Sequence, residues 1–314
     1  MICAAARITF KGLMAVVFLS LITWVHCAPA RAASPVILIL NEAKEARVTV
    51  TPVRGNINVL MGSGGNIVVL DTPHGLLMVD GGIELSKASV LHAIRAVSKE
   101  NPSYPINTHY HFDHTDGNAW LHRLGATIVA HDNTLKRLSA IARVDDWDWS
   151  FPPTPEDGLP TILVSTDKVI PFHGTTVEIQ SYGPSHTDTD LWVYFVQQDI
   201  LATGDTWWNG YYPFIDNENG GSIDGMIRAA NANIAKVSAH TILVPGHGPI
   251  GSRADLIRYR DMLVTVRKNV AALKAQGLNR EQVIAAKPSA AFDGVWGGFV
   301  INGDFFTKIV YDGL

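Results

Sequence analysis

Cysteine is almost absent from this sequence. The chain contains two, Cys3 and Cys27, and both lie near its N-terminus. The rest of the chain therefore offers no disulfide, no thiol nucleophile and no thiolate ligand for a metal.

Positive charge is also scarce. The 25 Lys and Arg residues are outnumbered by 29 Asp and Glu residues, which gives a formal net charge of −4. Nucleic-acid binding depends on basic surface, so this balance argues against a nucleic-acid partner and against a nuclease.

The sequence shows no repeat, low-complexity tract or flexible linker, and its length fits one α/β domain.

No apolar run is long enough to cross a membrane. The run over residues 12–25 falls short of the roughly 20 residues that a spanning helix needs. Basic residues precede this run, and Ala30-Arg31-Ala32 follows it as a small-x-small cleavage site. The pattern predicts a signal peptide over residues 1–32 and a single hydrolase domain over residues 33–314. We therefore expect a periplasmic or secreted protein that is free of the membrane after cleavage.

The most informative motif present is His109-Tyr110-His111-Phe112-Asp113-His114. It follows the end of a predicted buried strand and precedes a predicted helix. On an extended segment His109 and His111 point to the same side, whereas Asp113 and His114 fall on the turn. Burying so many unpaired polar groups would be costly unless a cation coordinates them. Imidazole and carboxylate suit zinc or a similar cation, and two adjacent ligand sets favour two ions.

Three further ligand candidates each stand where a predicted strand meets a loop: His186, Asp205 and His247. In α/β folds, loops at strand ends converge on sites that the sheet holds rigid. The remaining histidines lack such neighbours, and we interpret them as structural or solvated: His26, His74, His92, His122, His131, His173 and His240.

Together with Asp80 in Val79-Asp80-Gly81-Gly82, these motifs resemble those of the metallo-β-lactamase superfamily of hydrolases. Periodicity alone predicts only a mixed α/β protein, whereas the resemblance implies an α/β fold of the four-layer αβ/βα sandwich type. It also implies two metal sites, one held by His109, His111 and His186, the other by Asp113, His114 and His247. Asp205 would bridge both ions, and Asp80 would support the ligand loop through hydrogen bonds.

The activity implied is that of an exported hydrolase with two Zn²⁺ ions, with iron or manganese as alternatives. A metal-bound hydroxide would open a cyclic amide or ester, and Asp113 would orient the nucleophile and pass its proton to the leaving group. The substrate is expected to be a small molecule. Export to the periplasm favours a β-lactam as the substrate. The best-known β-lactamases use Cys at the position of Asp205, and the Asp in this chain instead favours a lactone or thioester.

Two other classes of protein fit the sequence less well, and the sequence does not define the oligomeric state. Relatives with a diiron redox site carry Glu where this chain has His111, which favours hydrolysis. A non-catalytic metal-binding protein is disfavoured because all seven ligands are present.

Aromatic residues after Asp205 are predicted to line a wide apolar substrate pocket, with at least half of them expected in the core: Trp207, Trp208, Tyr211, Tyr212 and Phe214. Either tyrosine could donate a hydrogen bond to the developing oxyanion. Residues 62–65, Gly-Ser-Gly-Gly, predict a hairpin turn, and the resemblance suggests a mobile flap over the metals there. The aromatic segment 145–160 is either a loop pinned to the body or part of the site mouth.

Overall fold

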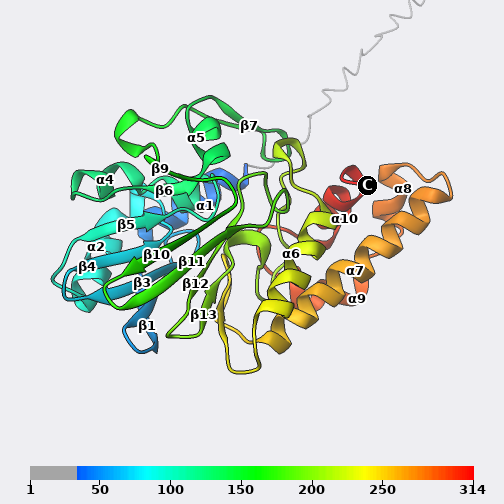
Figure 1. Cartoon of the computed structure of the whole chain (residues 1–314). Helices are drawn as coiled ribbons and strands as arrows, with labels where there is room; N and C mark the ends of the chain where they lie inside the picture. The colour runs from blue at the N-terminus through cyan, green and yellow to red at the C-terminus, as the bar shows by residue number, and fades with distance from the viewer. Residues whose placement is uncertain (1–33) are drawn as a thin grey trace, which may run out of the picture. The chain divides into compact units, whose positions relative to one another are not determined.

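Two β-sheets lie face to face at the centre of the fold (Figure 1). The computed structural model describes residues 34–314, and the predicted signal peptide lies outside the described residues. The first sheet has seven strands in the order β1 (Thr49–Arg54), β2 (Ile57–Met61), β3 (Ile67–Thr72), β4 (Gly75–Val79), β5 (Pro102–Ile106), β6 (Val129–His131) and β9 (Ile162–Val164). The second has five, in the order β10 (Asp167–Phe172), β11 (Thr175–Ser181), β12 (Leu191–Phe195), β13 (Ile200–Ala202) and β14 (Ile242–Val244).

Each sheet begins as an antiparallel meander and ends with parallel strands. Strands β1 to β4 pair antiparallel, and β4, β5, β6 and β9 then pair parallel. In the second sheet, β10 to β13 pair antiparallel, and β14 joins β13 in parallel. Parallel pairing requires crossover connections, and these are supplied by helices on the outer faces.

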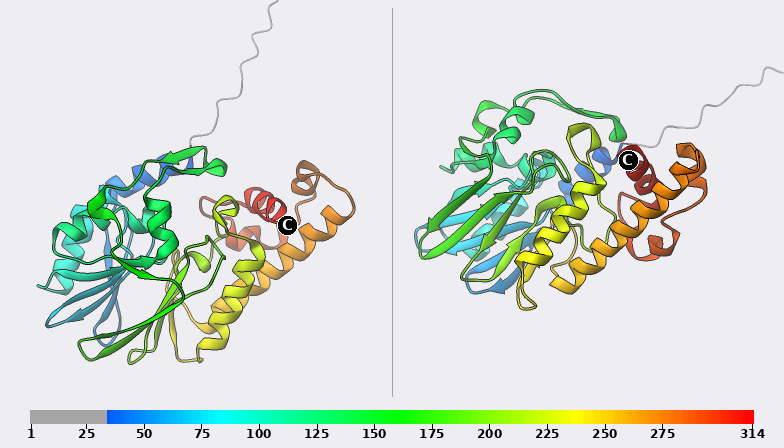
Figure 2. Two further views of the ribbon diagram at one scale, coloured as in Figure 1. Left: turned by 45° about the horizontal axis from the view of Figure 1, so that its top comes forward. Right: turned by 45° about the vertical axis from the view of Figure 1, so that its right-hand side comes forward.

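The helices are α1 (Pro35–Glu45), α2 (Lys87–Val97), α3 (Phe112–Thr115), α4 (Asn118–Arg123), α5 (Asp132–Leu138), α6 (Ile223–Lys236), α7 (Arg253–Ala275), α8 (Arg280–Ala285), α9 (Ala290–Trp296) and α10 (Gly303–Asp312). Helices α2 and α4 cover the outer face of the first sheet, and α6 and α7 cover that of the second (Figures 1 and 2). A small hairpin, β7 (Ala142–Val144) and β8 (Trp149–Phe151), stands apart from both sheets. No helix in residues 34–314 has the length and hydropathy needed to cross a membrane.

Three apolar layers hold this arrangement together, because each central strand buries both of its faces. Alternate residues of β3 show the principle: Val68 and Leu70 pack between the sheets, whereas Ile67 and Val69 pack against α2 and α4. The third layer lies between the second sheet and the pair α6 and α7. The predicted four-layer αβ/βα sandwich is confirmed.

A 3₁₀ turn, Glu84–Ser86, precedes α2, which becomes α-helical only from Lys87. Helix α5 ends at Leu138, and residues 142–144 then pair as β7 with β8. Helix α1 and the C-terminal helices α8 to α10 were not predicted.

Candidate metal centre

The predicted ligands stand on loops that follow strands, and the two sheets bring these loops together. Residues 109–114 follow β5 and run into α3, whereas His186 lies between β11 and β12. Asp205 follows β13 in a 3₁₀ turn, Gly204–Thr206, and His247 follows β14. All seven side chains are buried, and they form two groups. Within each group the donor atoms all lie within 4.8 Å of one another.

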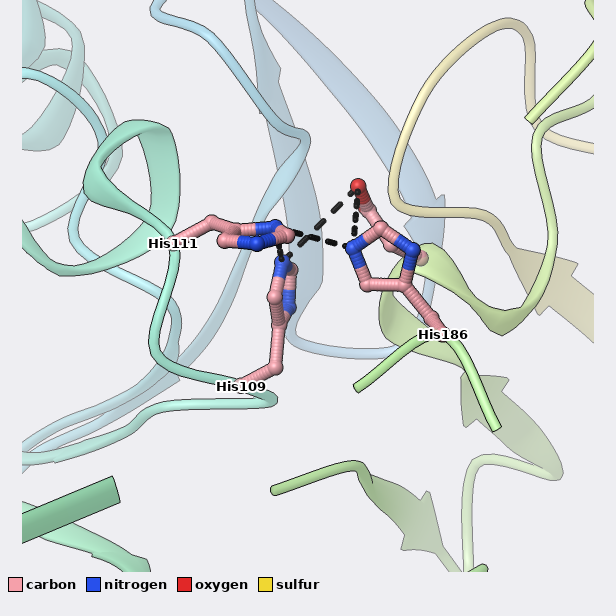
Figure 3. A group of neighbouring side chains, drawn as sticks. His109, His111 and His186 are labelled. Carbon is pink, nitrogen blue, oxygen red and sulfur yellow. Dashed lines mark hydrogen bonds and ion pairs between the residues drawn. The ribbon is translucent and has the colours of Figure 1, made fainter. Parts of the chain in front are cut away.

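The first group is a triangle of imidazole rings completed by Asp205 (Figure 3). Nδ1 of His111 lies 3.1 Å from Nε2 of His109 and 2.9 Å from Nε2 of His186. Oδ2 of Asp205 lies 3.8 Å from Nε2 of His109 and 3.6 Å from Nε2 of His186.

The outward-facing nitrogen of each ring has a hydrogen-bond acceptor, and this partner fixes the tautomer. His111 donates from Nε2 to Oδ2 of Asp216 at 3.0 Å, and His186 donates from Nδ1 to the carbonyl of Phe214 at 2.9 Å. His109 donates from Nδ1 to Oγ1 of Thr108, because that hydroxyl gives its own proton to Asp80. Three nitrogen lone pairs therefore face one another, an arrangement that is repulsive without a cation and suits one held by neutral imidazoles.

The second group contains Asp113, His114 and His247, and it meets the first group at Asp205. Nε2 of His114 lies 3.1 Å from Oδ1 of Asp205 and 3.5 Å from Oδ2 of Asp113. Nε2 of His247 lies 3.3 Å from Oδ2 of Asp205 and 3.2 Å from Oδ2 of Asp113. Both carboxylate oxygens of Asp205 thus lie within reach of this second group, and one also faces the first.

Hydrogen bonding points to the same conclusion. Nε2 of His114, Nε2 of His247 and Oδ1 of Asp205 are buried and form no hydrogen bond within the described chain, although Nε2 of His114 lies 3.1 Å from Oδ1 of Asp205. Buried polar atoms without hydrogen bonds carry a large desolvation cost. Divalent cations between the two groups would satisfy them, so the residues present fit a two-metal site.

The electrostatics differ between the two groups. Burial lowers the pKa of His186 to about 4 and places the pKa of His109 well below its usual value. For His247, burial alone would lower the pKa, but the carboxylates of Asp205 and Asp113 raise it to about 9. The same carboxylates, with Asp80, raise the pKa of His114 well above its usual value against the effect of burial. The carboxylates therefore favour positive charge at the second group, and a bound cation would supply it.

Two buried aspartates position the histidines. Asp80 has a positive φ of 65°, and its carboxylate accepts from Nδ1 of His114 at 2.8 Å and from the backbone N–H of Thr108 at 2.7 Å. Asp216 accepts from His111 and from the hydroxyl of Tyr110 at 2.5 Å. Sequence reasoning identified Asp80 through the resemblance but missed Asp216, since nothing separates it from the other acidic residues of the chain.

Two glycines allow the backbone to lie directly against the ligands. A Cβ atom at Gly65, in the β2–β3 turn, would lie 2.2 Å from Cε1 of His114. A Cβ atom at Gly246 would lie 1.9 Å from Oδ1 of Asp205. The predicted hairpin at residues 62–65 is present and packs against the second group, whereas its mobility stays a prediction.

A cavity of about 220 Å³ opens onto both groups. Ligand side chains form its floor, and its walls come from segments far apart in the sequence: Ile39, Glu42 and Ala43 of α1, Gly62 and Gly64 of the β2–β3 turn, and the aromatic rings of Trp147, Trp208, Phe214 and Phe299. Trp147 lies 4.7 Å from Phe214 between ring centroids, so the aromatic segment 145–160 contributes to the site mouth.

Of the five aromatic residues predicted to line the pocket, Trp208 and Phe214 do so, and the ring of Trp208 lies 4.3 Å from that of His247. Trp207 and Tyr212 are fully buried in the core, and Tyr211 packs against Phe299 behind the cavity wall. The hydroxyl of Tyr212 donates to Oδ1 of Asp293 at 2.8 Å, so it cannot serve the site as an oxyanion donor. The prediction for these three residues is therefore corrected.

A larger cavity of about 310 Å³ lies on the other side of the ligand loop, between α4, α5 and residues 151–157. His111 lines both cavities, but it is the only ligand that lines the larger one. The smaller cavity, which Asp113, His186, Asp205 and His247 also line, is therefore the candidate active site.

Comparison with known proteins identifies the family. Residues 60–252 match the model of the metallo-beta-lactamase superfamily, and the chain belongs to this superfamily of metal-dependent hydrolases. A curated relative, hydroxyacylglutathione hydrolase of Polaromonas sp. strain JS666, is 28% identical over 145 residues, which cover 45% of this chain. The match spans 47% of that enzyme, about half of its length.

Solved structures show the same fold at low sequence identity. The stereoselective inverting sec-alkylsulfatase Pisa1 from Pseudomonas sp. is 14% identical, with a TM-score of 0.63 over 84% of this chain and 50% of that one. A metallo-beta-lactamase from Pontibacter korlensis is 20% identical, with a TM-score of 0.55 over 69% of this chain and 99% of that one. The DIM-1 metallo-beta-lactamase is also 20% identical, with a TM-score of 0.56 over 70% and 98% of the two chains.

Proposed function

We propose that this protein is a two-metal acyl hydrolase, with zinc as the expected cation, that opens a cyclic amide or ester. The observation that carries the proposal is the convergence of seven candidate ligand side chains in two adjoining groups, five of which line one cavity with largely apolar walls. When bound, two divalent cations would lower the pKa of a water molecule and polarise the carbonyl oxygen of the substrate.

Asp113 has the position that general acid–base chemistry requires. Its carboxylate lies 3.2 Å from Nε2 of His247, and it also lines the cavity. It can therefore orient the attacking water, accept its proton and deliver that proton to the leaving group. The aromatic rings of Trp147, Trp208 and Phe214 exclude bulk water from the floor of the cavity, which strengthens the electrostatic interactions there.

Different observations support two candidate classes of substrate. β-Lactams are favoured by the fold shared with the solved metallo-beta-lactamases. Lactones and thioesters are favoured by Asp205, since a carboxylate placed between both groups gives a symmetric all-His/Asp site, and by the similarity to a hydroxyacylglutathione hydrolase. Likeness to a sec-alkylsulfatase adds a sulfate ester to the compounds that have to be compared.

One substrate panel tests the proposal. Zinc-loaded protein would be assayed with a chromogenic cephalosporin, a penicillin, an acyl-homoserine lactone, a glutathione thioester, a secondary alkyl sulfate and a phosphodiester. We expect a cyclic amide or ester to be turned over with kcat/KM above about 10⁴ M⁻¹s⁻¹, the range of native substrates. Asp113→Ala and the chelated protein serve as controls. Best activity on the phosphodiester or the sulfate ester would refute the acyl-hydrolase assignment.

Export belongs to the same proposal. Cleavage after Ala32 would leave Ser34, whose side chain accepts a hydrogen bond from the N–H of Val36 and caps α1. Cleavage would thus leave the structured part of the chain, including the cap of α1, intact. Mass spectrometry of protein recovered from the periplasm should give the mass of residues 33–314. Recovery of the full-length chain from the cytoplasm alone would contradict export.

A further inference from the structure

Helix α1 turns one face toward the metal centre. Ile39, Glu42 and Ala43 line the active-site cavity, and this spacing of three and four residues places them on the same side of a helix. The start of the helix is anchored, because Val36 is fully buried and the hydroxyl of Ser34 donates to the carbonyl of Trp147 at 2.5 Å. The position of Glu42 at the cavity is therefore fixed by the fold.

The side chain of Glu42 makes no polar contact that would stabilise the fold of the described residues. Within residues 34–314 its carboxylate forms no hydrogen bond and no ion pair, and the residue is exposed to solvent. Among the described residues that line this cavity, Glu42 is the one charged side chain outside the metal-ligand groups, and no Lys or Arg is present. A negatively charged substituent on a substrate would meet only repulsion at this wall.

The remaining walls suit a positive charge. Trp208 and Phe299 lie 6.0 Å apart between ring centroids, and both line the cavity with Glu42. The faces of aromatic rings attract cations and are used to bind quaternary ammonium groups. The carboxylate of Glu42 lines the same cavity and adds a charge of the opposite sign to that of an ammonium group. Apolar Ile39 and Ala43 would accommodate alkyl substituents on the nitrogen.

We propose that the substrate carries an alkylated ammonium group, which binds between Glu42 and the rings of Trp208 and Phe299 while its carbonyl lies over the metal-ligand groups. This inference rests on the proposed acyl-hydrolase function and specifies its substrate class. Glu42 would be the residue that determines specificity.

The test uses matched esters that differ in charge. The first is the para-nitrophenyl ester of γ-trimethylammonio-butyrate, and the second is its isostere in which a tert-butyl group replaces trimethylammonium. The third is the para-nitrophenyl monoester of glutarate, which is anionic. We expect zinc-loaded protein to prefer the ammonium ester over its isostere by about tenfold in kcat/KM.

Variants assign that preference to one side chain. Glu42→Gln should lower the ratio of the two kcat/KM values toward unity, and Glu42→Lys should favour the glutarate ester. Glu45→Gln, an exposed glutamate on the same helix but outside the cavity lining, should keep the wild-type ratio. A ratio that Glu42→Gln leaves unchanged, or a wild-type preference for the glutarate ester, would overturn the inference.

A binding measurement distinguishes failure of this inference from failure of the proposed function. The alcohols obtained by reducing the ammonium acid and its isostere would be titrated into zinc-loaded protein by calorimetry. Tighter binding of the ammonium alcohol by about tenfold, lost in Glu42→Gln, supports the ammonium site even if no ester is hydrolysed. Equal Kd values refute that site even if hydrolysis is fast.

Discussion

Nε2 of His111 donates a hydrogen bond to Oδ2 of Asp216 at 3.0 Å, across 105 residues of sequence. This contact fixes the tautomer of His111 and directs the lone pair of Nδ1 toward His109 and His186. The same carboxylate oxygen accepts from Tyr110, and the side-chain amide of Asn219 donates to both carboxylate oxygens. Asp216 is thus a positioning residue for the first ligand group, held in place from three sides.

Asp216→Asn should weaken metal binding at the first group without emptying the second. An amide can present its N–H to His111 and reverse the tautomer, so we expect a loss of about 10- to 100-fold in affinity for one of two ions. Competition with a chromogenic chelator measures this loss. Asp224→Asn, which removes an exposed carboxylate paired with Arg267, is the matched control and should bind like wild type. Unchanged affinity in Asp216→Asn would contradict the positioning role.

Metal content should follow the division into two ligand groups. Elemental analysis of the protein purified without added metal should give about two equivalents, mostly zinc. His111→Ala removes a ligand of one group, so it should retain about one equivalent. Asp205→Asn should lower both, because Asp205 lies between the two groups. His92→Ala, an exposed histidine on α2, should retain both ions. One equivalent in the wild-type protein after zinc addition would refute the two-metal site.

Glycine at position 246 should be required for the position of Asp205. Gly246→Ala would place a Cβ atom 1.9 Å from Oδ1 of Asp205, and the neighbouring atoms are backbone, so the turn itself has to move. We expect loss of bound metal and a fall in the free energy of unfolding of about 2 kcal/mol or more. Gly294→Ala provides the control, because a Cβ atom there meets no atom within 4 Å. Metal titration and denaturant unfolding would check both variants, and wild-type metal content in Gly246→Ala would contradict the packing argument.

Local sequence was enough to identify the candidate metal ligands that the structure brings together, but not the residues that surround them. Four of the seven ligands lie in residues 109–114, where period-two alternation and a turn determine their directions. The other three each follow a strand, a position that the pattern of apolar runs reveals. Asp216 could not be identified in this way, because its partner His111 is 105 residues away and any of the acidic residues could have filled that role.

The cavity walls were unpredictable for a related reason. Ile39 and Phe299 lie near opposite ends of the described chain, and only the packing of α1 and of the segment before α10 brings them together. Trp207 and Trp208 show how little separates wall from core. They are neighbours in sequence, yet Trp207 is fully buried in the core whereas Trp208 lines the cavity. Their placement depends on a turn after β13 that composition does not specify.

These two tryptophans give the sharpest test of the cavity. Trp207 is fully buried in the core, so Trp207→Ala should lower the free energy of unfolding by about 3–5 kcal/mol. Trp208 faces the cavity above His247, so Trp208→Ala should lose less stability but raise KM for the best substrate of the panel by roughly tenfold. Denaturant unfolding and steady-state kinetics on both zinc-loaded variants separate the two roles. If Trp207→Ala changed KM more than Trp208→Ala did, the cavity would not be the substrate site, and the wall formed by Trp208 and Phe299 would lose its assigned function.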